Sequence, residues 1–213
     1  MSDFPVGMQF DDAAQQREAA TLGMWAFLAT EVLFFGGALL GFTIYRAKYL
    51  EAFAEGSREL YASIGTGNTA VLLISSFCMA LAVHEIGQSN ASRKKIRLYL
   101  LLTSLLGTVF LCVKAVEYTI DYREGAIPHF AWNAAKFEHP DQAQLFFCFY
   151  FALTMIHALH MTIGIVIMLI LAFRTREEDF TTNMHNTIEM VGLYWHFVDV
   201  VWIFLFPLLY LVG

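Results

Sequence analysis

Five long apolar stretches constrain the fold of this chain more than any other feature of its sequence. They cover roughly residues 21–45, 66–88, 96–121, 143–173 and 187–212. A helix needs about 20 apolar residues to cross the hydrocarbon core of a bilayer, and only helices satisfy their own backbone hydrogen bonds as isolated spans. The sequence therefore predicts an all-α integral membrane protein, a bundle of five transmembrane helices that forms one domain over residues 1–213.

Composition supports a membrane protein and excludes several other classes. Apolar residues make up 58% of the chain, well above the usual share for a soluble domain, and they are gathered into blocks. The net charge of −6 and the lack of a basic stripe argue against binding to nucleic acid. The cysteines, Cys78, Cys112 and Cys148, lie inside apolar blocks, where we expect them to be small buried hydrophobes. The first twenty residues lack the features of a signal peptide and predict a short polar leader.

The distribution of Lys and Arg predicts how the bundle is oriented. Four basic residues crowd the short loop between the second and third stretches, and Arg174 and Arg176 follow the fourth stretch. Both loops lie on the same side of the membrane as the amino terminus. The basic residues of the opposite side are spread through longer loops. The positive-inside rule therefore places the amino terminus inside and the carboxyl terminus outside.

The last stretch carries polar residues on one helical face. At 100° per residue, His185, Glu189, His196 and Asp199 fall within an arc of about 80°. Ionisable groups are costly in hydrocarbon, so this face is expected to meet a protein partner or a hydrated cavity. We interpret it as part of a buried polar network.

Other polar residues lie inside the remaining stretches. Glu31 is near the middle of the first and is flanked by phenylalanines. His157 and His160 are three residues apart near the middle of the fourth, so they are expected to share a face. Lys114 and Glu117, at the end of the third, could pair on one face, or Lys114 could extend its amine to the membrane surface instead.

Two catalytic interpretations of these residues compete with a structural one. A di-metal carboxylate site uses Glu-x-x-His on its helices, and here no Glu stands three residues before a His within a stretch. A haem held by His157 or His160 and by His196 would give a stand-alone b-type cytochrome. The preferred reading is that these histidines form hydrogen bonds inside a packed bundle. No metal ligand set, phosphate-binding glycine loop or nucleophile elbow is recognised.

Several motifs resemble those of subunit III of the haem-copper respiratory oxidases. The run YWHFVDVVWIFLF, residues 194–206, closely resembles the last helix of that family, and Phe180, Thr181, His185 and Glu189 stand at the family's offsets. TEVLFF at 30–35, NTAVLLISS at 68–76, the Glu117–Tyr118 pair and HALHMTIG at 157–164 resemble earlier helices. The matches follow the family's order through all five stretches. The number of stretches resembles a shorter bacterial form without the first two of seven helices.

The chain also departs from the family pattern at three positions. Met155 and Ala158 stand where many relatives have glycine, and Lys114 occupies a position often held by glutamine.

The resemblance implies an accessory function without a redox centre. Subunit III packs on catalytic subunit I beside subunit II, holds phospholipid in a cleft, and supports proton uptake in a complex that reduces dioxygen with electrons from cytochrome c or quinol. This chain is then expected to bind no haem, copper or other metal itself and to lie in a bacterial inner membrane. Alternatives are subunit III of a quinol oxidase, a nitric oxide reductase accessory protein, and a stand-alone b-type cytochrome or membrane metalloenzyme.

The same resemblance assigns roles to particular residues. Glu31 becomes the carboxyl that faces the lipid cleft. Arg174 and Arg176 become candidates for binding lipid phosphates. The remaining polar residues form the buried network: His157, His160, His185, Glu189, His196 and Asp199.

Overall fold

A computed structural model describes residues 9–88, 90–177 and 182–213, with the backbone alone at 176–177 and 182–183. Six α-helices account for most of this chain. The long ones are α1 (Ala13–Lys48), α3 (Ala62–Ile86), α4 (Arg93–Glu124), α5 (Pro140–Glu177) and α6 (Thr182–Tyr210). The short elements are α2 (Leu50–Glu59), strands β1 (Ala126–Ile127) and β2 (Ala131–Trp132), and the 3-10 turn η1 (Ala134–Lys136).

The all-α fold predicted from the sequence is confirmed, and each of its five stretches lies on one long helix. These five helices are long and apolar enough to cross a membrane. That all five do so, and with the amino terminus inside, stays a prediction. The helices begin before the apolar stretches because polar residues extend them, as in α1, where Asp12 caps the first turn by accepting a hydrogen bond from the backbone N–H of Gln15 at 2.7 Å.

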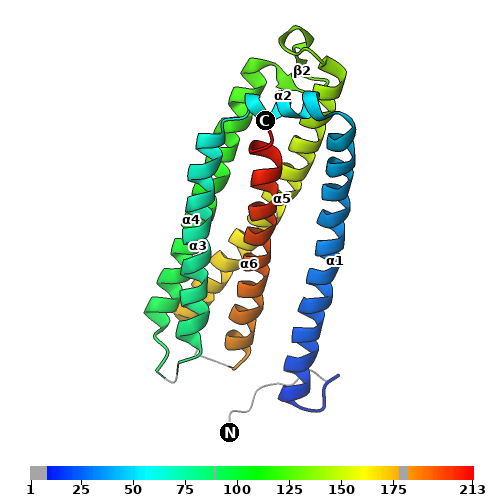
Figure 1. Cartoon of the computed structure of the whole chain (residues 1–213). Helices are drawn as coiled ribbons and strands as arrows, with labels where there is room; N and C mark the ends of the chain where they lie inside the picture. The colour runs from blue at the N-terminus through cyan, green and yellow to red at the C-terminus, as the bar shows by residue number, and fades with distance from the viewer. Residues whose placement is uncertain (1–8, 89, 178–181) are drawn as a thin grey trace.

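Helix α2 was not predicted from the sequence, for a physical reason. Its ten residues, LEAFAEGSRE, are too few and too polar to cross a bilayer. The helix instead lies across one end of the bundle, where the carboxyl terminus also lies (Figure 1). Its apolar face is held by the fully buried Phe53, and the Ser57 hydroxyl donates to the Leu209 carbonyl at 2.8 Å. At Gly56 an added Cβ would come within 2.5 Å of Phe146, so only glycine permits this contact.

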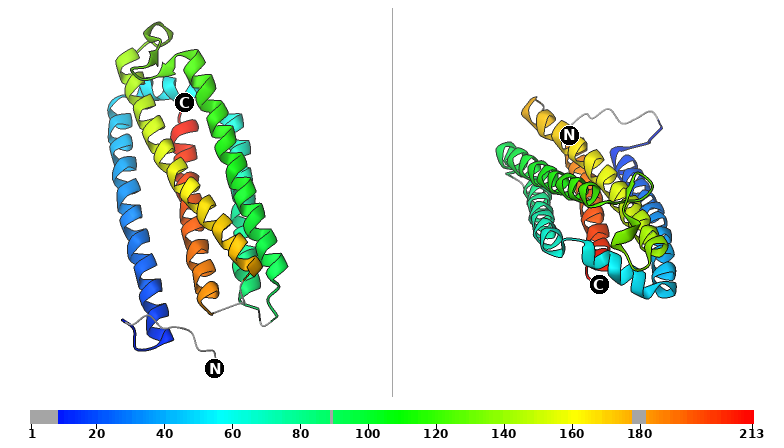
Figure 2. Two further views of the ribbon diagram at one scale, coloured as in Figure 1. Left: turned by 180° about the vertical axis from the view of Figure 1, so that it is seen from behind. Right: turned by 90° about the horizontal axis from the view of Figure 1, so that it is seen from above.

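The long helices do not contribute equally to the core. α3 packs along α4, α6 lies beside α3, and α5 crosses the bundle obliquely (Figure 2). Close packing of α6 depends on Trp195, which is fully buried. Added Cβ atoms at Gly107 of α4 and at Gly164 of α5 would each come within 2.8 Å of its ring. Two glycines therefore set the distance of α6 from its neighbours.

Helix α1 stands at the side of the bundle (Figure 1). Only 17% of its most apolar stretch is buried, against 50% for α6. Its main contacts with other elements are with α6, α5 and α2. Much of its apolar surface is thus left for lipid or a partner protein.

The prediction that all three cysteines are buried was wrong. Cys112 is exposed, and Cys78 and Cys148 are half-buried. An apolar stretch that faces a bilayer exposes its small hydrophobes as readily as its large ones, so an apolar sequence context alone does not indicate burial in protein. All three are free thiols.

Candidate functional site

A hydrogen-bonded carboxylate–imidazole pair lies where α1 meets α5. The Nε2 atom of His160 is 3.1 Å from Oε2 of Glu31, and both side chains are largely buried, with 14% and 18% of their surface exposed. The other ring nitrogen of His160, Nδ1, is 2.8 Å from the carbonyl oxygen of Ile156. A carbonyl oxygen only accepts, so Nδ1 carries a hydrogen.

This tautomer determines where a proton can lie between Glu31 and His160. With Nδ1 protonated, Nε2 of a neutral ring can only accept, so a hydrogen bond to it requires a protonated Glu31. If the ring is instead cationic, Nε2 donates to the Glu31 carboxylate. Both arrangements hold one proton between Glu31 and His160 and carry no net charge. The pair can therefore shift a proton between its members without placing a net charge inside the bundle.

The pair opens onto an apolar cleft between α1, α5 and α6. The cleft has a volume of about 460 Å³. Its other walls are made by Met24, Phe27, Ile163, Ile167, Val191 and Tyr194. The Tyr194 hydroxyl donates to the His160 carbonyl oxygen at 2.9 Å, so the polar tip of this wall is already satisfied. What remains is a hydrocarbon-lined space with one polar pair at its side, which suits an extended apolar chain.

A buried ion pair is sealed inside the bundle nearer the end where α2 lies. Nζ of Lys114 is 2.9 Å from Oε2 of Glu117, and their side chains are only 5% and 1% exposed. Lys114 also donates to the hydroxyls of Tyr150 at 3.1 Å and Tyr210 at 2.6 Å. Both tyrosines donate in turn to Oε1 of Glu117. All three ammonium hydrogens and both carboxylate oxygens have partners, as a buried ion pair requires.

The pairing of Lys114 with Glu117 is confirmed, and the alternative in which Lys114 reaches the membrane surface is excluded. Three further members of this cluster were not predicted from the sequence: Tyr150, Tyr210 and Asp121. Asp121 is one helical turn beyond Glu117 and is 3% exposed. Within the described part of the chain its Oδ2 has no hydrogen-bond partner. Its spacing of four from Glu117 was the one available signal, because it places both carboxyls on one face of α4.

The two histidines of α5 are turned toward different neighbours. His160 lines the cleft beside α1. His157 is 1% exposed and packs between Phe110 of α4 and Trp202 of α6, with ring centroids 5.7 and 5.1 Å away. Neither nitrogen of His157 has a hydrogen-bond partner among the described residues. The structure thus does not bring His157 and His160 into one hydrogen-bonded group.

The polar face of α6 lies against α3 over part of its length. His196 is hydrogen-bonded through Nδ1 to the Ser76 hydroxyl at 2.8 Å. Asp199 is 2% exposed, and neither of its carboxylate oxygens has a partner in the part of the chain that the structure describes. Nearer the start of α6, His185 and Glu189 are 3.5 Å apart and about two-fifths exposed. The predicted network is therefore distributed over separate contacts along the bundle.

Several predicted residues lie at the ends of helices or outside the described chain. Arg174 is exposed near the end of α5. The side chain of Arg176 and the residues Phe180 and Thr181 lie outside the described part. Within residues 9–88, 90–177 and 182–213, no three His, Cys, Asp or Glu side chains gather in a way that could hold a metal ion.

Comparison with protein families gives a match that covers all five long helices. Residues 8–213 match the family model described as cytochrome c oxidase subunit III. The chain belongs to the subunit III family of the haem-copper oxidases. Membership, together with the five apolar helices, makes it an integral membrane protein. The resemblance stated from its motifs is confirmed.

Individual relatives within the family differ in the electron donor they are named for. The chain is 32% identical to cytochrome c oxidase subunit 3 of Thermostichus vulcanus, with 94% of this chain and 91% of that one covered. It is also 32% identical to quinol oxidase subunit 3 of Bacillus subtilis, with coverages of 90% and 86%. A relative from Loxodonta africana, named cytochrome c oxidase subunit 3, is 31% identical over 91% of this chain and 70% of its own length.

Proposed function

We propose that this chain is the accessory subunit III of a proton-pumping terminal oxidase, that it carries no redox centre, and that it packs against catalytic subunit I beside subunit II. The observation that carries the proposal is the family match over residues 8–213. The haem and copper then belong to the partner subunits. We place the complex in a bacterial inner membrane with the amino terminus of this chain inside.

The cleft beside Glu31 is the proposed working part of the subunit. Its apolar walls suit the acyl chain of a phospholipid, and Arg174, with Arg176, supplies cations at a helix end for a lipid phosphate. A bound acyl chain would exclude water from the Glu31–His160 pair, which can hold its proton without a net charge. We infer that the lipid and this pair together keep subunit I competent in proton uptake over many turnovers.

The proteins that co-purify with this chain test the proposal. The tagged full-length chain, purified in mild detergent from its own membranes, is expected to bring down a haem-copper subunit I and a subunit II. A binuclear copper centre in subunit II would assign cytochrome c as the electron donor. Recovery of the chain alone would refute the proposal.

Two alternatives give different results in the same preparation. A subunit II without that copper centre would indicate a quinol oxidase, which the similarity to the Bacillus subtilis protein favours. A nitric oxide reductase as partner would indicate an accessory subunit of that enzyme.

A stand-alone b-type cytochrome or membrane metalloenzyme is tested separately. His157, His160 and His196 would have to supply its ligands, but they lie against Trp202, Glu31 and Ser76 respectively. Absorption spectra and metal analysis of the isolated chain are expected to show neither haem nor metal in stoichiometric amount. Either one bound to this polypeptide would overturn the assignment to subunit III.

A further inference from the structure

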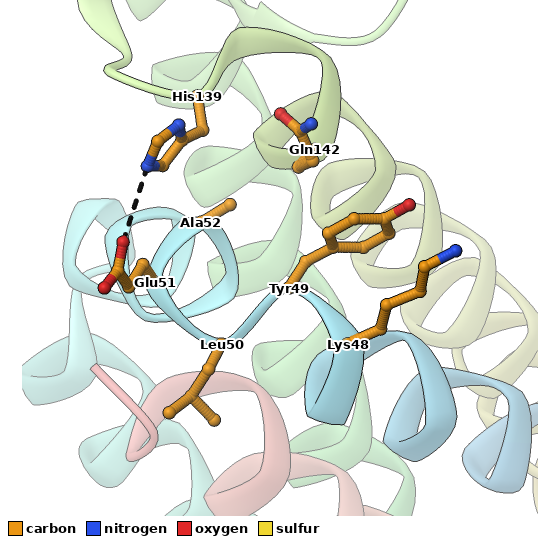
Figure 3. Close-up of a pocket in the computed structure, with 7 residues that line it drawn as sticks. All are labelled: Lys48, Tyr49, Leu50, Glu51, Ala52, His139 and Gln142. Atoms are coloured by element: carbon orange, nitrogen blue, oxygen red, sulfur yellow. Dashed lines mark ion pairs between the residues drawn. The ribbon is translucent and has the colours of Figure 1, made fainter.

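Two adjoining hollows lie at the α2 end of the bundle, far along α1 from the cleft at Glu31. One has a volume of about 590 Å³ and the other about 370 Å³. They share Leu50, Glu51 and His139. Figure 3 shows the smaller hollow, with Lys48 on one side and the Glu51–His139 pair on the other. The larger one is also lined by Arg46, Ala54, Glu55, Arg58, Glu138, Val212 and Gly213.

The walls of these hollows are fixed by contacts within the chain. The carboxylate of Glu55 accepts hydrogen bonds from the backbone N–H groups of Glu138 at 2.7 Å and His139 at 3.4 Å. These bonds join α2 to the start of α5. The Ser57–Leu209 hydrogen bond joins α2 to the end of α6. Three helices therefore hold the site in shape.

The charges that line the hollows are of both signs and are mostly not paired with one another. Arg46 is half-buried, and neither it nor Arg58 forms a salt bridge within the described residues. Lys48 lies over the Tyr49 ring, with its Nζ 5.1 Å from the centroid. Glu51 is 89% exposed and 3.6 Å from His139, which is beyond hydrogen-bonding distance. The site thus offers arginine donors without an ion-pair partner among the described residues, and two exposed carboxylates, Glu138 and Glu51, the latter in a long ion pair with His139.

The position of the hollows selects the kind of ligand. They lie where the long apolar helix α1 ends, and Leu50, which is 61% exposed, borders both. A molecule bound there would have its polar part among the charges and any apolar chain along the helices below. Arginine pairs with phosphate oxygens through charge-assisted hydrogen bonds. A primary ammonium can donate to carboxylates as lysine does, whereas a quaternary ammonium has no hydrogen to donate.

We propose that the two hollows together bind the headgroup of a phospholipid that carries a primary ammonium, as phosphatidylethanolamine does. Arg46 and Arg58 hold the phosphate, and Glu51 and Glu138 receive the ammonium. A phosphatidylcholine headgroup satisfies the arginines but not the acids. A phosphatidylglycerol headgroup has no cation. The site is separate from the cleft at Glu31, and it requires only that α1 crosses the membrane, whichever oxidase the chain serves.

The test uses the full-length chain with whatever subunits accompany it, stripped of lipid in mild detergent. Phosphatidylethanolamine, phosphatidylcholine and phosphatidylglycerol of the same acyl chains are titrated separately, and bound lipid is counted by native mass spectrometry. The wild-type complex is expected to prefer phosphatidylethanolamine. The double variant R46A/R58A is expected to bind it about tenfold or more weakly, because two charge-assisted hydrogen-bond donors are lost. E51Q/E138Q is expected to abolish the preference over phosphatidylcholine while leaving phosphatidylcholine binding unchanged.

Control variants distinguish a specific headgroup site from nonspecific electrostatic attraction of lipid. Arg123 is also exposed at this end of the bundle but does not line the hollows, so R123A is expected to bind as the wild type does. R46K/R58K keeps the charge and is expected to recover part of the affinity. Elution profiles in size-exclusion chromatography verify that each variant is folded.

Three outcomes would overturn the proposal. One is equal weakening by R46A/R58A and R123A, and another is equal affinity for phosphatidylethanolamine and phosphatidylcholine. The third is displacement of the lipid by soluble phosphoethanolamine at equal concentration, which would assign the site to a water-soluble phosphate compound.

Discussion

The bundle contains two buried acid–base pairs whose surroundings differ. Lys114–Glu117 is closed on all sides, and its remaining hydrogen-bonding capacity is taken by Tyr150 and Tyr210. Glu31–His160 borders an apolar cleft. The first pair joins three helices through fixed charges, so its removal should lower the stability of the bundle. The second can move a proton and contacts whatever occupies the cleft, so its removal should change the activity of the oxidase.

The largest expected effect is that of Lys114→Ala. It leaves Glu117 buried without its counter-charge, for which the penalty is about 3–5 kcal/mol. Thermal denaturation of the purified complex should show a strongly lowered midpoint, or the complex should fail to assemble. The double variant K114M/E117L removes both charges and should recover much of the loss. A stable Lys114→Ala protein would contradict the sealed arrangement.

Removal of one hydroxyl from the sealed cluster should have a smaller effect. Tyr210→Phe keeps the ring but deletes bonds to Lys114 and Glu117, and hydrogen bonds to charged groups contribute about 1.5–3 kcal/mol. Thermal midpoints should fall less than for Lys114→Ala. The matched control is Tyr194→Phe, which deletes a hydrogen bond to a neutral carbonyl. Equal loss in the two variants would remove the distinction between charged and neutral partners.

His196→Leu should damage assembly by an intermediate amount. It leaves the half-buried Ser76 hydroxyl without its side-chain partner, at about 1–3 kcal/mol. Asp199→Leu should impair assembly less, because neither carboxylate oxygen of Asp199 has a hydrogen-bond partner within the described residues and none is left unpaired by the change. Quantifying subunit I in pull-downs of each variant measures the effect. Normal recovery of subunit I with both variants would show that this face of α6 does not hold the complex together.

Glu31→Ala should leave assembly largely intact and shorten the working life of the oxidase. Glu31→Gln, which keeps the shape but cannot exchange a proton with His160, should do the same if proton sharing matters. Oxygen consumption followed through repeated turnovers checks both variants against the wild type. If Glu31→Gln were unaffected while Glu31→Ala lost activity, packing against the lipid rather than the proton would be the function of this residue.

The smallest effect is expected at the partly exposed ion pairs of Lys136 with Glu59 and Glu124, which provide a reference for the two buried pairs. These pairs are partly open to solvent, where such contacts contribute about 0–1 kcal/mol. Lys136→Ala should therefore shift the thermal midpoint little. A shift as large as that of Lys114→Ala would mean that burial does not set the importance of these charges.

The features that could be predicted from the sequence are those that depend on residues close together in the chain. Apolar run lengths located the five long helices, and a separation of three residues made the pairing of Lys114 with Glu117 one of two expected arrangements, between which the structure decides. The sequence could not predict that Glu31 meets His160, 129 residues away, or that Tyr150 and Tyr210 converge on one lysine. Such contacts depend on how helices pack, as where Gly107 and Gly164 let α4 and α5 approach Trp195 of α6. The amphipathic α2 was missed because its partners are the ends of other helices, which no local pattern reveals.

The way α2 ties one end of the bundle has a mechanical consequence for α1. Residues 50–59 anchor the chain to α5 and α6 close to Lys48, whereas the long remainder of α1 makes few buried contacts. Helix α1 is thus held most firmly beside Tyr49, whereas none of its residues before Leu28 is buried. A change in the lateral pressure of the bilayer would move this first part of α1 most, and Met24 and Phe27 of this part line the cleft. Membrane thickness and composition would then act on the cleft through α1, without a ligand or a change in covalent structure.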